Sequence, residues 1–264
     1  MARGVLLDID GVLTVSWRPL PGAVETMSWL RRHGIAYRLV TNTSSRSRRQ
    51  IAALLGDAGM EVDPAHIVTA VSSAARYLSE TYPGRGCLLV NDGSVGDDLQ
   101  DLERADPSSA GVVLLGGAGP GVGYAELNAV FRLAMEGVPV VALHRNTRFA
   151  TADGPSLDMG AFIVGIELAA SVEISVVGKP APAFFASALH ALGVGADEAI
   201  MVGDDIDADV LGSQAVGITG VLVRTGKYRA SDLERDTPPD LVIDSVAALP
   251  ELLSRPADET RPDG

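Results

Sequence analysis

The chain alternates between short apolar segments and longer segments whose apolar residues recur at helical spacing. Residues 5–7, 35–40 and 199–202 have the composition of buried strands, whereas Val24, Met27 and Leu30 recur at helical spacing between the first two. Such alternation is typical of right-handed βαβ units that build a parallel sheet. We therefore expect an α/β fold with a doubly wound parallel sheet.

Two acidic residues follow the first predicted strand. Asp8 ends the apolar run, Asp10 stands one residue beyond it, and Gly11 opens a tight turn. Two carboxylates at a strand end cannot both point into a core, and charged oxygens left unpaired there would be costly. A capping pair at a strand-to-turn junction is one interpretation. The other is a divalent cation, and oxygen-only ligation of this kind suits Mg²⁺.

Polar side chains follow three further predicted strands. They are Thr41 and Asn42 after residues 35–40, Lys179 after residues 174–177, and Asp204, Asp205, Asp207 and Asp209 after residues 199–202. In parallel α/β sheets the ligand site lies beyond the carboxyl ends of the strands, so we expect these groups to share one crevice. Carboxylates, hydroxyls, an amide and a lysine together suit phosphoryl transfer.

In such a site Asp8 is the expected nucleophile, which attacks phosphorus to form an aspartyl-phosphate. Asp10 is expected to protonate the leaving oxygen and then to take a proton from the hydrolytic water. Mg²⁺ is expected between the Asp8 carboxylate, the backbone carbonyl of Asp10 and Asp204.

The remaining polar residues have supporting roles in this hypothesis. Thr41, Asn42 and Lys179 are expected to hold phosphate oxygens. Asp205 and Asp209 are expected to orient the groups that bind the metal.

Residues 74–177 carry strand and helix patterns of their own, enough for a smaller α/β domain inserted into a core of residues 1–73 and 178–264. The glycine-rich residues 116–123 in this insert do not match a dinucleotide-binding fingerprint, because Val122 stands where the third glycine or alanine belongs. They also lack the ending of a P-loop. We expect a turn there, before a helix around residues 127–134.

The loop after residues 138–143 of the insert carries several polar side chains. Arg145, Asn146 and Asp158 are candidates for substrate selectivity. His144 is expected to be an exposed loop residue at a strand end.

Composition excludes some partners. The formal net charge of −13 argues against a nucleic-acid partner, which needs a basic surface, but local cations can still hold a small phosphorylated metabolite. The single cysteine, Cys87, allows no internal disulfide, which fits a reducing compartment. The apolar runs are too short for a membrane helix. We expect a cytoplasmic protein with no membrane partner.

Four motifs together resemble those of the haloacid dehalogenase superfamily. They are DIDGVL at residues 8–13, VTNTSSRS at 40–47, VGKP at 177–180 and VGDDIDAD at 202–209. The long insert between the second and third motifs resembles class IIA members. The loop from His144 to Glu167 and the sequence GKYRASD at 226–232 are similar to the branch that contains phospholysine phosphohistidine inorganic pyrophosphate phosphatase.

The resemblance implies a Rossmann-like core with Asp8 on the central strand and an inserted cap domain that contacts the substrate. It also implies a Mg²⁺-dependent phosphatase of small metabolites and is compatible with a homodimer. A phosphotransferase or mutase remains an alternative, as does a catalytically inactive protein that binds a phosphorylated ligand. The substrate class is open among sugar phosphates, nucleoside monophosphates, pyridoxal phosphate, phosphoglycolate, phosphoamino compounds and pyrophosphate.

Overall fold

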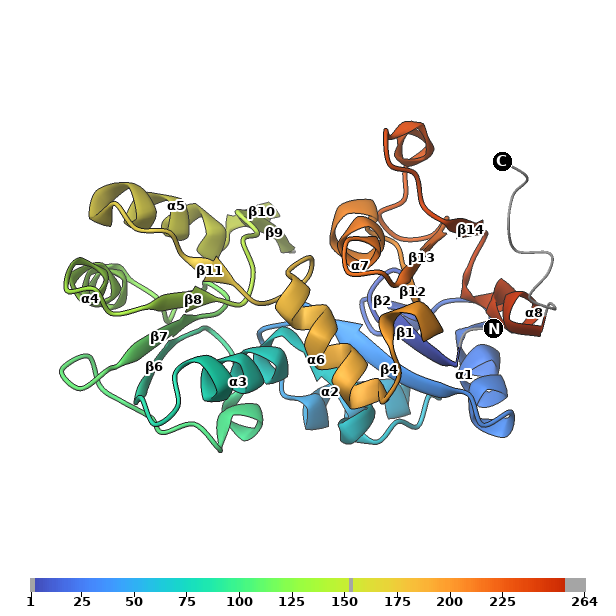
Figure 1. Ribbon diagram of the computed structural model, residues 1–264, viewed down its shortest axis with the longest axis horizontal. Coiled ribbons are helices and arrows are strands. Elements are labelled where there is room, and N and C mark those ends of the chain that lie inside the picture. Colours follow the sequence, from blue (N-terminus) through green and yellow to red (C-terminus); the bar gives the residue numbers. More distant parts are fainter. Residues whose placement is uncertain (1–2, 152–153, 255–264) are drawn as a thin grey trace. The chain divides into compact units, whose positions relative to one another are not determined.

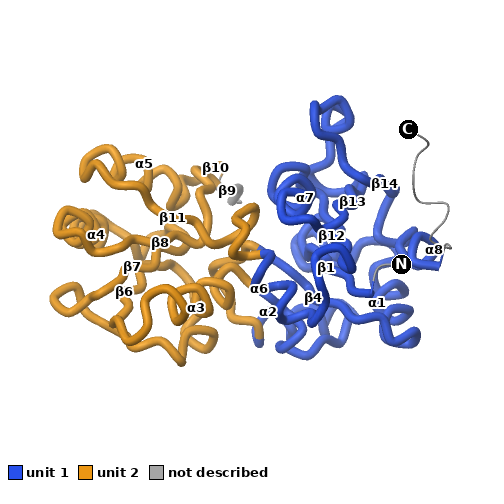
Figure 2. Tube along the Cα trace, in the orientation of Figure 1, with its two compact units in different colours: residues 1–41, 49–68, 185–264 blue, residues 42–48, 69–184 orange. Residues whose placement is uncertain are grey.

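The computed structural model describes residues 3–151 and 154–254. The chain forms two compact units, which Figure 2 shows in different colours. Unit 1 comprises residues 1–41, 49–68 and 185–264, and unit 2 comprises residues 42–48 and 69–184. The boundaries of the core and the inserted domain given above, with the insert at 74–177, remain a prediction.

Unit 1 is built on a six-stranded sheet with the strand order β14-β13-β12-β1-β4-β5. Its strands are β1 (Gly4–Asp8), β4 (Ala36–Thr41), β5 (Ile67–Thr69), β12 (Ala199–Gly203), β13 (Thr219–Val223) and β14 (Leu241–Ile243). The pairs that join β14, β13, β12, β1 and β4 are all parallel. In Figure 1, β1, β4, β12 and β13 lie together. The expected α/β architecture with a parallel sheet is confirmed.

Helices and short turns connect these strands. The α-helices are α1 (Ala23–Arg32), α2 (Arg48–Asp57), α6 (Pro182–Leu192), α7 (Gly212–Gln214) and α8 (Leu249–Ser254). The shorter elements are η1 (Pro64–His66), η3 (Ala196–Glu198), η4 (Ile206–Leu211), η5 (Ala230–Glu234), η6 (Val246–Ala248) and the antiparallel pair β2 (Thr14–Val15) and β3 (Arg18–Pro19).

Strand β1 occupies a central position because its whole length is apolar up to Asp8. Every residue of β1 is buried, as is typical of a parallel strand with both faces covered. Its register with β4 and β12 brings Asp8 opposite Val40 and Leu7 opposite Val202. Asp8, the end of β4 and the end of β12 are therefore at the same edge of the sheet.

Unit 2 has a four-stranded parallel sheet of its own, with the order β11-β8-β7-β6. Its strands are β6 (Cys87–Val90), β7 (Val112–Leu115), β8 (Val140–Ala142) and β11 (Ser175–Val176). The helices are α3 (Ala70–Thr81), η2 (Gly96–Leu99), α4 (Tyr124–Met135) and α5 (Met159–Ala170), and the antiparallel pair is β9 (Arg148–Thr151) with β10 (Gly154–Leu157). As expected, a helix, α4, follows the glycine-rich residues.

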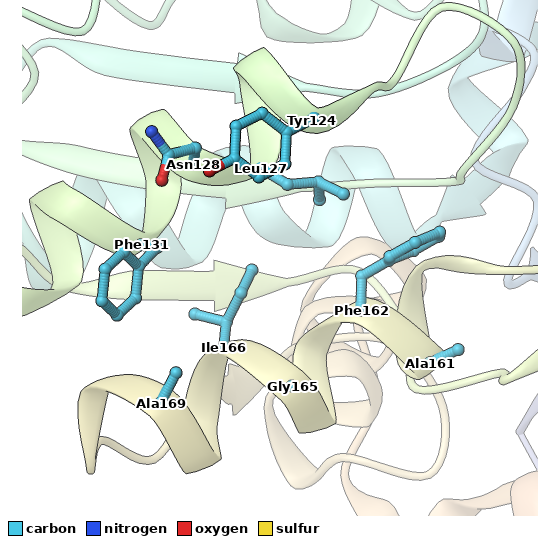
Figure 3. A pocket seen from close by; sticks show the side chains of 9 residues that line it. All are labelled: Tyr124, Leu127, Asn128, Phe131, Ala161, Phe162, Gly165, Ile166 and Ala169. Carbon is cyan, nitrogen blue, oxygen red and sulfur yellow. The ribbon is translucent and has the colours of Figure 1, made fainter.

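An apolar groove of about 320 Å³ lies between α4 and α5. Figure 3 shows the side chains that line it, none of which carries a charge; they are Tyr124, Leu127, Asn128, Phe131, Ala161, Phe162, Gly165, Ile166 and Ala169. The lining thus offers no positive charge to a phosphate group. Across the described ranges, every helix is too short or too polar to cross a membrane.

Candidate active site

Three buried carboxylates meet at the edge of the unit 1 sheet. Asp8 ends β1, Asp204 directly follows β12, and Asp209 lies in η4. One oxygen from each lies within 4.8 Å of the others, and their exposed fractions are 7%, 2% and 1%. Three carboxylates that lie so close together in a buried setting repel one another unless a cation or protons are present. The donor set, which consists of hard carboxylate oxygens, fits a Mg²⁺ or Ca²⁺ ion.

The cluster contains Asp209, for which the sequence predicts only an orienting role, together with the two predicted metal carboxylates Asp8 and Asp204. Residue 209 reaches the strand end because η4 is a turn of π-helix that begins directly after Asp205. A Cβ at Gly203 would overlap the Asp209 side chain, so glycine at this position lets Asp209 pack against the end of β12.

Asp10 differs from Asp8 in its environment. Its side chain is exposed, while Ile9 between the two is buried. The turn that follows is closed by the Gly11 amide, which donates to the Thr14 carbonyl at 2.7 Å, and Gly11 has a φ of +90°. An accessible carboxylate can exchange protons with water, as a general acid or base must.

A second loop, after β13, packs directly on Asp204. The Lys227 amide donates to Asp204 Oδ2 at 2.7 Å, and Thr225 Oγ1 donates to the Gly11 carbonyl at 2.6 Å. A Cβ added at Gly11 or Gly226 would overlap the Asp204 carboxylate. The loop thus fixes both the carboxylate and the turn after Asp8. The sequence predicts no role for Gly226, because a single glycine three residues after a strand end is not a specific signal.

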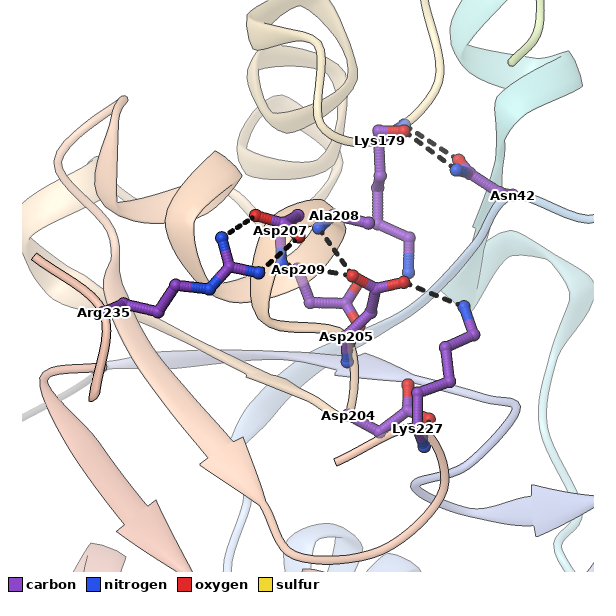
Figure 4. A network of polar contacts seen from close by, with 9 residues as sticks. All are labelled: Asn42, Lys179, Asp204, Asp205, Asp207, Ala208, Asp209, Lys227 and Arg235. Carbon is purple, nitrogen blue, oxygen red and sulfur yellow. Dashed lines mark hydrogen bonds and ion pairs between the residues drawn. The ribbon is translucent and has the colours of Figure 1, made fainter. Parts of the chain in front are cut away.

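Figure 4 shows that Asp205 and Asp207, the other acidic residues of the segment 204–209, have partners of their own. Asp205 Oδ1 caps η4 by accepting from the Asp207 and Ala208 amides at 3.1 and 3.0 Å, and Asp205 Oδ2 lies 3.0 Å from Lys227 Nζ. Arg235 forms two hydrogen bonds with the Asp207 carboxylate, at 2.9 and 2.8 Å.

These contacts change the acidity of two groups. Burial alone would raise the pKa of Asp205, but the Ala208 amide and the Lys227 ammonium hold this pKa below its usual range. Burial alone would lower the pKa of Lys227, but the negative charge of Asp205, Asp204 and Asp209 raises it above its ordinary value. Both groups are therefore charged at neutral pH.

Asn42 and Lys179 are joined to each other within unit 2. The Asn42 side-chain amide donates to the Lys179 carbonyl at 2.9 Å, and the Lys179 backbone amide donates to Asn42 Oδ1 at 2.8 Å. Thr41 is buried at the end of β4 in unit 1. The strand before Lys179 lies inside the predicted insert, residues 74–177, and it belongs to the sheet of unit 2. That strand, β11, pairs with β8 in the sheet of unit 2, and a two-residue strand carries no local signal of its partner.

The loop after β8 also differs from expectation at one position. His144, predicted to be exposed, is only 4% exposed, with Nε2 3.4 Å from Ser44 Oγ and Nδ1 3.9 Å from Asp158 Oδ2. Burial lowers the pKa of His144, and the nearby Asp158 opposes this shift. The residue is enclosed because segments distant in sequence, including Ser44 and Asp158, pack around the strand end.

The predicted selectivity residues lie in unit 2. Arg145 forms hydrogen bonds of 2.9 and 2.5 Å with the Glu167 carboxylate. Asp158 is buried and caps α5, where its Oδ1 accepts from the Met159 and Ala118 amides at 2.8 and 3.1 Å. Asn146 is exposed, and its backbone carbonyl accepts from the Gly160 amide at 2.9 Å.

Comparison with sequence families finds two matches. Residues 5–104 match the family described as haloacid dehalogenase-like hydrolase, and residues 176–249 match a second family of similar hydrolases. The two matched segments contain Asp8 and Asp204, respectively.

Individual relatives match over nearly the whole chain. The chain is 38% identical to human haloacid dehalogenase-like hydrolase domain-containing protein 2, over 90% of each chain. It is also 38% identical to bovine phospholysine phosphohistidine inorganic pyrophosphate phosphatase, over 97% of this chain and 96% of the relative. Among solved structures, the p-nitrophenyl phosphatase from Archaeoglobus fulgidus superposes with a TM-score of 0.88 at 29% identity, covering 95% of this chain and 99% of the other.

Proposed function

Because this chain belongs to the haloacid dehalogenase-like hydrolases, we propose that it is a phosphatase of small phosphorylated metabolites that acts through an aspartyl-phosphate on Asp8. The observation that carries the proposal is the cluster of Asp8, Asp204 and Asp209 at one edge of the unit 1 sheet. The phosphatases among the similar proteins support the reaction class.

In the proposed reaction an oxygen of the Asp8 carboxylate attacks phosphorus. The bond from phosphorus to the leaving oxygen breaks, and Asp10 supplies the proton that this oxygen takes up. Asp10, now a carboxylate, takes a proton from water, and the water oxygen attacks phosphorus. The bond from phosphorus to Asp8 then breaks, which releases phosphate and restores both residues.

We propose Mg²⁺ as the cation that Asp8, Asp204 and the Asp10 carbonyl hold, with Asp209 beside them. When bound, the ion would offset the repulsion between the Asp8 carboxylate and the phosphate. Asp205 orients this part of the site by capping η4.

Thr41, Asn42 and Lys179 keep the proposed role of binding phosphate oxygens, through a hydroxyl, an amide and a positive charge. The two hydrogen bonds between the Asn42 side chain and the Lys179 backbone support a joint role, because they hold the two residues next to each other.

We propose that the substrate is selected by the predicted insert, residues 74–177. The names of the relatives suggest phospholysine, phosphohistidine, inorganic pyrophosphate and p-nitrophenyl phosphate as first substrates to test. Arg145, Asn146 and Asp158 remain the proposed selectivity residues. Because Arg145 is held by Glu167 and Asp158 caps α5, their effect on selectivity would come through the position of the loop between them.

We also propose a homodimer in the cytoplasm that uses the groove between α4 and α5. Tyr124 and Leu168 on these helices are 83% and 82% exposed. In a chain with a net charge of −13, an uncharged face is where two copies can approach with least repulsion.

Phosphate release from a panel of phosphorylated metabolites and pyrophosphate tests the proposal. The parent and Asp8→Asn are compared with Mg²⁺ or with EDTA. Release that requires Mg²⁺ and disappears in Asp8→Asn is expected, and the ranking of substrates then identifies the function. Transfer of phosphate to a second hydroxyl compound instead of water would indicate a phosphotransferase. Tight binding of one compound without turnover would replace the proposal with a ligand-binding role.

A further inference from the structure

The acidic run 204–209 of unit 1 is accompanied by a segment, residues 225–235, that follows β13 and carries Lys227 and Arg235. Two cations of this segment contact the run: Lys227 Nζ lies 3.0 Å from Asp205 Oδ2, and Arg235 is paired with Asp207 at 2.8 Å. These contacts neutralise the two carboxylates of the run that are outside the cluster of Asp8, Asp204 and Asp209.

The two ion pairs differ in solvent exposure and in their further contacts with the cluster. In the Arg235–Asp207 pair both side chains are substantially exposed, at 40% and 63%, and such surface pairs contribute little. The Lys227 side chain is also exposed, at 67%, but its partner carboxylate on Asp205 is only 26% exposed. The same residue also donates its backbone amide to Asp204 Oδ2 at 2.7 Å. Lys227 is therefore the residue of this segment that acts most directly on the cluster.

We propose that Lys227 is a positioning residue that limits how tightly the carboxylate cluster binds its cation. Its backbone amide fixes the orientation of Asp204, and its ammonium group offsets the negative charge of the acidic run. The site then stays folded without a metal and exchanges its cation readily. The inference rests on the proposed function, since it concerns the same metal site.

The backbone and the side chain of Lys227 can be tested separately. Lys227→Met keeps the amide donor and the length of the apolar stem but removes the charge, whereas Lys227→Arg keeps the charge. The matched control is Arg3→Met. Arg3 pairs with Glu198 at the opposite, amino end of β12, so this variant removes one positive charge from unit 1 away from the cluster.

The measurement is calorimetric titration of MgCl₂ into each protein after treatment with EDTA. We expect Lys227→Met to bind Mg²⁺ about 3- to 10-fold more tightly at low ionic strength, because a positive charge close to the ion is removed. The difference should shrink at about 1 M NaCl, where such interactions are screened. Lys227→Arg and Arg3→Met should resemble the parent.

Thermal unfolding gives a second readout. Without metal, Lys227→Met should unfold at a lower temperature than the parent, and saturating Mg²⁺ should narrow this gap because the ion supplies the missing positive charge.

The direction of the change in affinity separates the outcomes. A general loss of structure in Lys227→Met would weaken Mg²⁺ binding, which is opposite to the expected result. Unchanged or weaker binding in this variant, or an equal gain in Arg3→Met, would overturn the role of Lys227 while leaving the proposed phosphatase intact. A parent that binds no Mg²⁺ would instead overturn the proposed metal site itself.

Discussion

Gly226 offers a sensitive test of how the loop after β13 supports the site. Its φ is +60°, and an added Cβ would overlap the Asp204 carboxylate and lie 2.7 Å from the Cα of Gly11. Gly226→Ala must therefore move either the loop or Asp204. Because the Gly11 backbone offers no flexible end that could move aside, we expect the loop to shift and the Lys227 amide to lose its bond to Asp204.

The expected magnitude has two parts. A non-glycine residue in the left-handed region costs about 1–2 kcal/mol. A hydrogen bond to a charged group contributes about 1.5–3 kcal/mol. Gly226→Ala should therefore destabilise the protein by about 2.5–5 kcal/mol, and it should weaken Mg²⁺ binding at least tenfold because Asp204 loses its fixed orientation.

Gly34→Ala is the matched control. Gly34 lies in the same unit with a φ of +62°, and an added Cβ there would meet nothing within 4 Å. It should show only the backbone cost of about 1–2 kcal/mol, with Mg²⁺ affinity and phosphate release unchanged. The assays are urea unfolding, calorimetric Mg²⁺ titration and phosphate release. If the two variants lose the same stability and both retain Mg²⁺ affinity, the packing argument for the loop is refuted.

Three further outcomes follow from unit 2. Burial lowers the pKa of His144, so below about pH 6.5 the unfolded chain binds the extra proton more readily than the folded chain, and the protein becomes less stable as the pH decreases. His144→Gln should therefore reduce the drop in thermal midpoint between about pH 7.5 and pH 5.5. An unchanged drop would contradict this assignment. Asp158→Ala removes a helix cap and leaves buried amides unpaired, which should cost about 2–4 kcal/mol in urea unfolding, whereas a cost near zero would show that the cap contributes nothing. Leu168→Glu should convert the proposed homodimer to a monomer in light-scattering measurements, whereas Leu233→Glu in unit 1 should not; a dimer that survives Leu168→Glu would place its interface elsewhere.

Much of the sheet edge that carries the site could be predicted from the sequence. An apolar run that ends in an acidic residue is a local pattern, and it correctly located β1 with Asp8 and β12 with Asp204 following it. The alternation of strands and helices likewise predicted parallel sheets, because a parallel connection needs a crossover segment of helical length. Four motifs in the same order identified the family that the comparisons show.

Tertiary structure decided which distant segments meet. Asp209 joins the carboxylate cluster through the turn of η4, the loop containing Gly226 packs on Asp204, and Lys179 follows a strand of the other sheet. His144 is buried although its local sequence is polar. Local periodicity determines whether a segment is a strand or a helix. Strand partners and loop packing depend instead on contacts between residues far apart in the chain. A single sequence does not encode these contacts in any local pattern.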